Sequence, residues 1–353
     1  MALSIDVLSS YPPVQEAEVD KVLAEEIRDN EKKIVVLDDD PTGVQTVHDI
    51  SVYTNWEKTS IEQGFAEENK LFYILTNSRG FTAAQTEKAH KEIAEVVDQV
   101  AKETGKEYLF ISRSDSTLRG HYPLETTILK DEYEKNTGKK IDGEVLCPFF
   151  KEGGRFTIDD VHYVQYDDTL VPAAETEFAK DKTFGYTVSN LKEYVEEKTQ
   201  GAYKKENVTA ISLENIRELN YDKIEEQLLA VEDFNKVIVN AIDYVDVKIF
   251  CVALFRAMKK GKNFMFRTAA AIVKVMGGVS NQPLLTREQM VVKETDNGGI
   301  IVVGSHTDKT TRQMEKLREN KDIAFVELNA TLVNDEAAFA EEVTLTFDKM
   351  KNG

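Results

Sequence analysis

Two apolar runs that each end in a polar string constrain the fold of this chain most strongly. The run Ile34 to Leu37 leads into Asp38 to Gly43, and the run Tyr108 to Ile111 leads into Arg113 to His121. Such runs are typical of strands buried on both faces, which occur in parallel sheets covered by helices. In these sheets, ligands bind in the loops that follow the carboxyl ends of the strands. The two strings therefore predict a ligand site at one edge of a parallel sheet.

Strand and helix signals alternate along the rest of the chain. Further strand-like runs end at Leu75 and Leu146, and between Thr82 and Lys102 the apolar spacing is helical, with Gln85 in the capping-box position relative to Thr82. Later segments expected to be strands are 208–213, 237–239, 300–303 and 323–328, and those expected to be helices are 220–230, 247–276 (one or two helices) and 309–320. This alternation predicts an α/β fold of two domains, residues 1–230 and 231–353, with mostly parallel sheets and flanking helices.

Composition excludes several classes of function. The chain of 353 residues carries 44 basic and 63 acidic residues, and its net charge of −19 opposes binding to nucleic acid or to an anionic membrane. No apolar stretch approaches the length of a membrane span, and the first residues lack the basic start of a signal peptide, so we expect a cytoplasmic protein. Cys147 and Cys251 lie far apart and away from histidine clusters, which predicts buried free thiols. A homo-oligomer is compatible with the sequence.

The first polar string allows more than one kind of chemistry. Asp38, Asp40 and Thr42 have the Asp-x-Asp-x-Thr spacing of phosphatases in which the first aspartate is the nucleophile. Alternatively, the string binds the hydroxyls of a sugar-like substrate and one carboxylate is the base; the residues concerned are Asp39, Asp40, Thr42 and Gly43. The purely structural interpretation is a turn that caps the next helix. Three successive acids at a strand end are costly without a cation or a donor-rich partner, which favours a functional role.

The second polar string suits a small, anionic, polyhydroxylated molecule. Arg113 and Arg119 have the geometry to clamp a carboxylate in bidentate fashion. The side chains that we expect to meet vicinal hydroxyls are Asp115, Ser116 and Thr117. The structural alternative is a helix cap at Ser112 to Thr117, with Arg119 paired to Asp115 four residues earlier.

Several strings resemble, in their order, the motifs of the four-carbon acid sugar kinase family. They are Asp-Asp-x-Thr-Gly at 39–43, Thr-Asn-Ser-Arg at 76–79, Asp-Ser-Thr-Leu-Arg-Gly at 115–120, Cys147-Pro148 with Gly154-Arg155, and Gly-Gly-Ile-Ile-Val-Val-Gly-Ser at 298–305. The resemblance spans nearly the whole chain. It implies a phosphotransferase with an alcohol group as acceptor, which uses ATP and Mg²⁺ to phosphorylate a threonate, an erythronate or an oxo-tetronate.

The resemblance also implies roles for individual residues. Asp39 or Asp40 takes the proton from the substrate hydroxyl. The residues implied to bind the sugar acid are Thr42, Gly43, Arg79, Arg113, Ser114, Asp115, Ser116, Thr117, Arg119 and Gly120. Those implied to bind ATP, in the C-terminal domain, are Gly304 and Ser305, with Arg155 and Arg267 as weaker candidates. A turn-stabilising role for Arg155 and a helix-surface ion pair for Arg267 are the alternatives, and no metal ligand is assigned.

One departure from the family pattern concerns the C-terminal domain. Family members continue beyond the helix after Ser305 for roughly another hundred residues, about the length that completes such a domain. We therefore expect a truncated nucleotide-binding domain, and a chain that binds its sugar acid but transfers phosphate poorly. Two other functions stay open: a phosphatase with Asp38 as nucleophile, and a sugar-acid-binding protein without catalysis.

Overall fold

A computed structural model describes residues 1–291, 293, 298–305 and 307–352. The chain divides into two compact units, Met1–Pro283 and Leu284–Gly353. The boundary expected near residue 230 lies inside the first unit, because strands from both sides of it pair in one sheet. The predicted assignment of sugar acid and nucleotide to separate domains stays a prediction.

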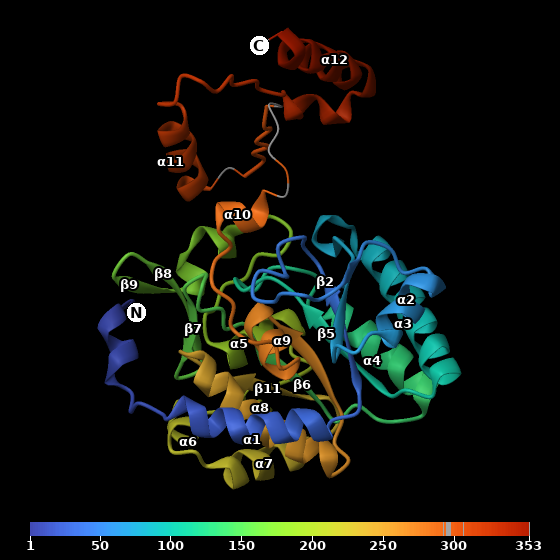
Figure 1. Ribbon diagram of the computed structural model, residues 1–353. Helices are drawn as coiled ribbons and strands as arrows, with labels where there is room; N and C mark the ends of the chain where they lie inside the picture. Colours follow the sequence, from blue (N-terminus) through green and yellow to red (C-terminus); the bar gives the residue numbers. More distant parts are fainter. Residues whose placement is uncertain (292, 294–297, 306, 353) are drawn as a thin grey trace. The chain divides into compact units, whose positions relative to one another are not determined.

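Eight of the described strands form one parallel sheet in the order β10-β11-β6-β12-β5-β2-β4-β3 (Figure 1). Their bounds are β2 Lys33–Asp38, β3 Val52–Tyr53, β4 Leu71–Leu75, β5 Tyr108–Arg113, β6 Gly143–Cys147, β10 Thr209–Ile211, β11 Asn235–Val239 and β12 Phe264–Thr268. The chain passes from β2 to β4 on one side and then returns to β5 on the other side of β2. The winding direction therefore reverses between β2 and β5, which is the position where open α/β sheets bind ligands.

Successive side chains of each strand point to opposite faces of this sheet, so each face has its own hydrophobic core. In β2, Ile34 and Val36 belong to one core, whereas Val35 and Leu37 belong to the other. The first face packs against α1 Glu16–Asp29, α6 Leu213–Arg217, α7 Tyr221–Leu229, α8 Tyr244–Lys259 and α9 Ala270–Met276. The second face packs against α2 Lys58–Ala66, α3 Ala83–Thr104 and α4 Leu124–Thr137, and Figure 1 shows these helices opposite α1, α7 and α8. The predicted α/β fold is confirmed, and Thr82 and Gln85 form the predicted capping box of α3.

A second, antiparallel sheet joins the first strand of the chain to three strands that follow β6, in the order β1-β9-β8-β7. Its strands are β1 Leu3–Ser4, β7 Arg155–Ile158, β8 Val161–Tyr166 and β9 Thr169–Pro172. After β9 the chain forms two short 3₁₀ helices, η3 Ala173–Glu175 and η4 Glu177–Lys180, and then α5 Leu191–Lys198. Leu146 and Ile238 of the parallel sheet share a core with Val164 of β8 and Tyr194 of α5. The small sheet is therefore fixed to the parallel sheet on the side of β6 and β11.

The expectation that residues 247–276 are wholly helical is wrong, because they contain β12. This strand lies between β5 and β6 and is buried along its whole length. A short apolar run that is buried on both faces cannot be distinguished from a buried helix by its periodicity. The correction moves Arg267 from a helix surface to the centre of the sheet.

The unit Leu284–Gly353 contains α10 Arg287–Met290, α11 Asp308–Leu317 and α12 Glu336–Asn352, with η6 Ala330–Asn334 before α12. The helix expected at 309–320 is confirmed as α11. The strands expected at 300–303 and 323–328 are not formed in the described part of this unit, and Ile300 and Val302 are exposed. An apolar run becomes a strand only where a neighbouring strand pairs with its backbone groups, and no such neighbour is present among the described residues.

Other structural elements of the chain are the 3₁₀ helices η1 Ile5–Ser10, η2 Ser78–Gly80 and η5 Lys205–Asn207. Cys147 and Cys251 are buried and free, as predicted. Among the described helices, none is both long and apolar enough to cross a membrane.

We expect Phe266→Ala to lower the free energy of unfolding by about 3 to 5 kcal/mol, because it leaves a cavity at the centre of the sheet. Phe347→Ala, at an exposed position, is the matched control and should change it by less than about 0.5 kcal/mol. Urea unfolding measures both. Equal, small effects of the two substitutions would contradict the central position of β12.

Candidate functional site

The two polar strings meet at the switch point of the parallel sheet. Asp38 ends β2, Arg113 ends β5, and the two residues are direct neighbours in the parallel pairing of these strands. The end of β2 is also tied to the loop after β4, because the amide of Thr76 donates to the carbonyl of Asp38 at 2.9 Å. The amide of Ser114 donates to the carbonyl of Thr268 in β12 at 2.8 Å. The sheet thus fixes where both loops begin.

A buried ion pair joins the two loops. Arg113 Nε donates to Asp38 Oδ1 at 2.7 Å, and its Nη2 contacts the same oxygen and donates to the carbonyl of Asp40 at 2.8 Å. The side chains of Asp38 and Arg113 are only 1% and 7% exposed. Burial raises the pKa of Asp38 to about 6, although Arg113 acts in the opposite direction. Arg113, predicted to clamp a substrate carboxylate, therefore directs these donors to the first loop.

Arg79 pairs with the other two carboxylates of the first loop. Its Nε and Nη2 donate to the two oxygens of Asp39 at 3.1 and 2.7 Å, and its Nη1 donates to Asp40 Oδ2 at 3.0 Å. Ser114 Oγ adds a hydrogen bond to Asp39 at 2.8 Å. Asp39 is 2% exposed, whereas Asp40 is 25% exposed. Burial alone would raise the pKa of Asp40, but the hydroxyl of Thr42 and the charge of Arg79 outweigh it and lower the pKa. Asp40 is thus ionised at pH 7 and is the most exposed of the three carboxylates in the first loop.

The second loop contains its own ion pair. Arg119 Nε donates to Asp115 Oδ2 at 2.7 Å, and the hydroxyl of Thr117 donates to the same carboxylate. Burial acts to raise the pKa of Asp115, but Arg79 and Arg119 outweigh it and lower the pKa. The pairing of Arg119 with Asp115, which the sequence allowed as a helical pair, occurs here in a loop. Ser116, beside them, is half-buried.

Two glycines allow the loops to approach each other. A Cβ atom on Gly43 would lie 2.1 Å from Asp38 Oδ2 and 2.3 Å from Arg113 Nε. A Cβ atom on Gly120 would lie 2.7 Å from Ser114 Oγ, and Gly120 has a φ of +118°, which other residues rarely adopt. Both glycines, predicted to contact substrate, have a structural reason to be glycine.

Three side chains that sequence reasoning missed hold the backbone of the second loop. His162 Nε2 donates to the carbonyl of residue 116 at 2.7 Å, and the hydroxyls of Tyr186 and Tyr194 donate to the carbonyls of residues 117 and 118 at 2.8 Å each. Burial lowers the pKa of His162 to about 4, so the ring is neutral at pH 7 and its Nδ1 accepts from Thr157 Oγ1 at 3.0 Å. No local pattern marks these residues, because they lie more than 40 positions after the loop.

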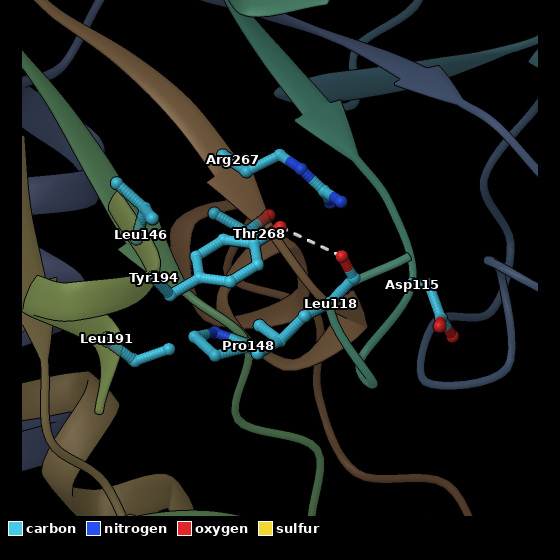
Figure 2. Close-up of a pocket in the computed structure, with 8 residues that line it drawn as sticks. All are labelled: Asp115, Leu118, Leu146, Pro148, Leu191, Tyr194, Arg267 and Thr268. Atoms are coloured by element: carbon cyan, nitrogen blue, oxygen red, sulfur yellow. Dashed lines mark hydrogen bonds between the residues drawn. The ribbon is translucent and has the colours of Figure 1, made fainter. Parts of the chain in front are cut away.

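A small pocket of about 10 Å³ lies behind the second loop. Its lining residues are Asp115, Leu118, Leu146, Pro148, Leu191, Tyr194, Arg267 and Thr268. Figure 2 shows the hydrogen bond from Tyr194 to the carbonyl of Leu118 beside this pocket. Arg267 Nη2 donates to the carbonyl of Arg119 at 2.7 Å. Arg267, predicted to bind ATP, thus supports the second loop.

Gly304 and Ser305, the main residues predicted to bind ATP, lie in the second unit, whereas the weaker candidate Arg155 begins β7 in the first unit. Gly304 and Ser305 precede α11, and Ser305 Oγ lies 2.8 Å from Thr310 Oγ1 and 3.4 Å from Thr307 Oγ1. Among the residues that the structure describes, no group of three or more histidine, cysteine or acidic side chains is arranged to hold a metal ion.

Comparison with known proteins identifies the family to which this chain belongs. The sequence model of a family described as "Sugar-binding N-terminal domain" matches residues 34–276. No curated protein matches the sequence. A solved domain of unknown function from Bordetella bronchiseptica, a domain-swapped dimer with bound citrate, has 19% identity and a TM-score of 0.50 over 88% of this chain and 69% of that chain. A Haemophilus influenzae protein assigned to a family of unknown function has 17% identity and a TM-score of 0.48 over 81% of this chain and 65% of that chain. The likeness to the Bordetella structure supports the fold.

Gly120→Ala should destabilise the protein more than Gly105→Ala. Both glycines have positive φ, but a Cβ atom on Gly105 meets open space, whereas one on Gly120 lies against Ser114. We expect about 1 to 2 kcal/mol of unfolding free energy to be lost for Gly105→Ala and about 1 to 3 kcal/mol more for Gly120→Ala. Urea unfolding of the two variants measures the difference, and equal losses would contradict the close contact of the loops.

The stability of the protein should depend on His162 between about pH 6.5 and pH 4. The pKa of His162 is about 4 in the folded protein, whereas the ordinary value of 6.5 applies in the unfolded chain. The unfolded chain therefore binds the proton first as the pH falls. Stability is therefore lost from pH 6.5 downward and levels off below pH 4, by up to about 3 kcal/mol.

The test is urea unfolding of wild type and His162→Gln at pH 7 and pH 4.5. The raised pKa of Asp38 makes the protein more stable as the pH falls through this interval. This contribution to stability is the same in both proteins and cancels in the difference between them. The variant should lose less stability than wild type on acidification. Identical losses would show that His162 is not buried as a neutral ring.

Proposed function

Because the chain belongs to the family of sugar-binding N-terminal domains, we propose that it binds a four-carbon sugar acid at the switch point and phosphorylates one of its hydroxyls with ATP. The observation that carries the proposal is the arrangement of partly exposed carboxylates and guanidinium groups in the loops that follow β2, β4 and β5. Carboxylates accept hydrogen bonds from sugar hydroxyls, and guanidinium groups bind an acid group. Two of the motifs that resemble four-carbon acid sugar kinases, at 39–43 and 115–120, lie in these loops. The Bordetella structure was solved with bound citrate, which is a small carboxylic acid.

Asp40 is the proposed base in this reaction. A general base must reach the proton that it abstracts, and Asp40 is more exposed than Asp38 and Asp39. Arg79 and Thr42 hold its carboxylate in place through hydrogen bonds. Asp39, which is bound on both oxygens by Arg79, instead positions that guanidinium group.

ATP would supply the phosphoryl group. The hydroxyls of Ser305, Thr307 and Thr310 gather at the start of α11, where backbone amides suit phosphate oxygens, and this supports nucleotide binding in the second unit. The carboxylates of the first loop are already paired with guanidinium groups. These carboxylates therefore do not provide the ligands that would hold a magnesium ion by the protein alone.

The geometry is unfavourable for the phosphatase alternative. A nucleophilic aspartate must reach a phosphorus atom. Asp38 is 1% exposed, and one of its oxygens is held by Arg113. Its carboxylate therefore stabilises the loops rather than attacks a substrate.

The proposal is tested by incubating the chain with labelled ATP, Mg²⁺ and one candidate acid at a time. The candidate acids are the stereoisomers of threonate and erythronate, and the oxo-tetronates. Transfer of the label to one acid supports the kinase. Calorimetric binding of an acid without transfer would favour the binding protein, and label trapped on Asp38 from a phosphate ester would favour the phosphatase.

Asp40→Asn should lower the turnover number by about 100- to 10,000-fold, the usual loss on removing a general base. Affinity for the acid should change far less, because the amide keeps the size and hydrogen bonding of the carboxylate. Asp49→Asn, at an exposed position nearby in the chain, is the control and should leave both quantities unchanged. Steady-state kinetics and calorimetry measure them, and full turnover by Asp40→Asn would exclude it as the base.

A further inference from the structure

The guanidinium groups around the two loops differ in how many of their donors are engaged. Arg79 uses all its nitrogens on Asp39 and Asp40, and Arg113 uses its nitrogens on Asp38 and on the backbone carbonyls of Asp40 and Ser114. All the nitrogens of both guanidinium groups thus donate hydrogen bonds within the protein. Neither has a free edge for the bidentate recognition of a carboxylate.

Arg119 and Arg155 retain such an edge. Arg119 uses Nε on Asp115 and Thr117, and its terminal nitrogens have no hydrogen-bond partner in the part of the chain that the structure describes. Arg155, the first residue of β7, donates through Nη1 to the carbonyl of Gly153, and its buried Nε has no partner among the described residues. A buried donor without a partner is costly, so an acceptor is expected at this position.

The same aromatic ring brings the two guanidinium groups together. The central carbon atoms of Arg119 and Arg155 lie 5.1 and 5.5 Å from the ring centroid of Phe178 in η4. Burial lowers the pKa of Arg155 and the charge of Arg119 lowers it further, while Asp115, Tyr166 and Glu177 act in the opposite direction. An ion pair joins Arg119 to Asp115. Among the described residues, no ion pair joins Arg155 to a carboxylate, so its guanidinium group is available to an anionic ligand.

We infer that Arg119 and Arg155, supported by Phe178, bind the carboxylate of the sugar acid, and that Arg113 instead holds the loops together. This inference rests on the proposed function and identifies the part of the site that distinguishes a sugar acid from a neutral sugar. The carboxylate then lies on the side of β7 and the second loop. The hydroxyls of the substrate are left for Asp40 and Thr42 on the first loop.

The test compares an acid with its uncharged analogue. Calorimetry on the full chain measures the affinity for the threonate or erythronate that binds wild type, and for the carboxamide of the same compound, which keeps every hydroxyl. We expect Arg119→Gln and Arg155→Gln each to weaken binding of the acid by about 10- to 100-fold, as for the loss of charge-assisted hydrogen bonds. Binding of the carboxamide should be nearly unchanged. Arg28→Gln, at a position with an exposed side chain, is the control and should alter neither affinity.

The outcomes separate this inference from the proposed function. If wild type binds no four-carbon sugar acid, both are overturned. If wild type binds the acid and Arg155→Gln binds it equally well, only the inference is overturned. If Arg155→Gln weakens acid and carboxamide to the same extent, Arg155 supports the fold of the site and not the carboxylate, and the inference is again overturned. Circular dichroism at the temperature of the titration shows that each variant is folded.

Discussion

The ion pair between Asp38 and Arg113 is the interaction on which the rest of the site depends. It joins the ends of two neighbouring strands where the winding of the sheet reverses, and both side chains are almost completely buried. Burying two charges is costly, and removing one partner leaves the other uncompensated. Through Arg113 the pair also holds the carbonyl of Asp40, and Gly43 leaves the space that it needs. The more exposed groups of the site therefore rest on a layer of buried, paired charges.

The parallel sheet and the meeting of the two loops could be predicted from the sequence. Both depend on local patterns, because a buried parallel strand is a continuous apolar run and the polar residues after it must lie at its carboxyl end. The runs before Asp38 and Arg113 are of this kind. Residue types also predict a site for a small, anionic, polyhydroxylated molecule, since the two loops carry both acidic and basic groups; the ligand itself stays a prediction.

The partners within the site could not be predicted in the same way. Arg113 and Arg119 are equivalent as residue types, and only the register of β2 and β5 pairs one of them with Asp38. The sequence predicts a helix where β12 forms, because the five buried residues of this strand have no distinguishing period, and it therefore places Arg267 wrongly on a helix surface. The small antiparallel sheet acts on the second loop across a long separation in sequence. A local pattern contains no information about such contacts.

The hold of His162, Tyr186 and Tyr194 on the second loop acts on three successive backbone carbonyls and not on side chains. Every amino acid supplies the same carbonyl group, so the position of this loop does not depend on which side chain stands at residue 116, the one of the three that is only half-buried. Substitution there alters the surface offered to a ligand while the path of the backbone is kept. The fold thereby separates the placement of the loop from the choice of side chain at residue 116, and proteins with the same frame are free to differ at this position.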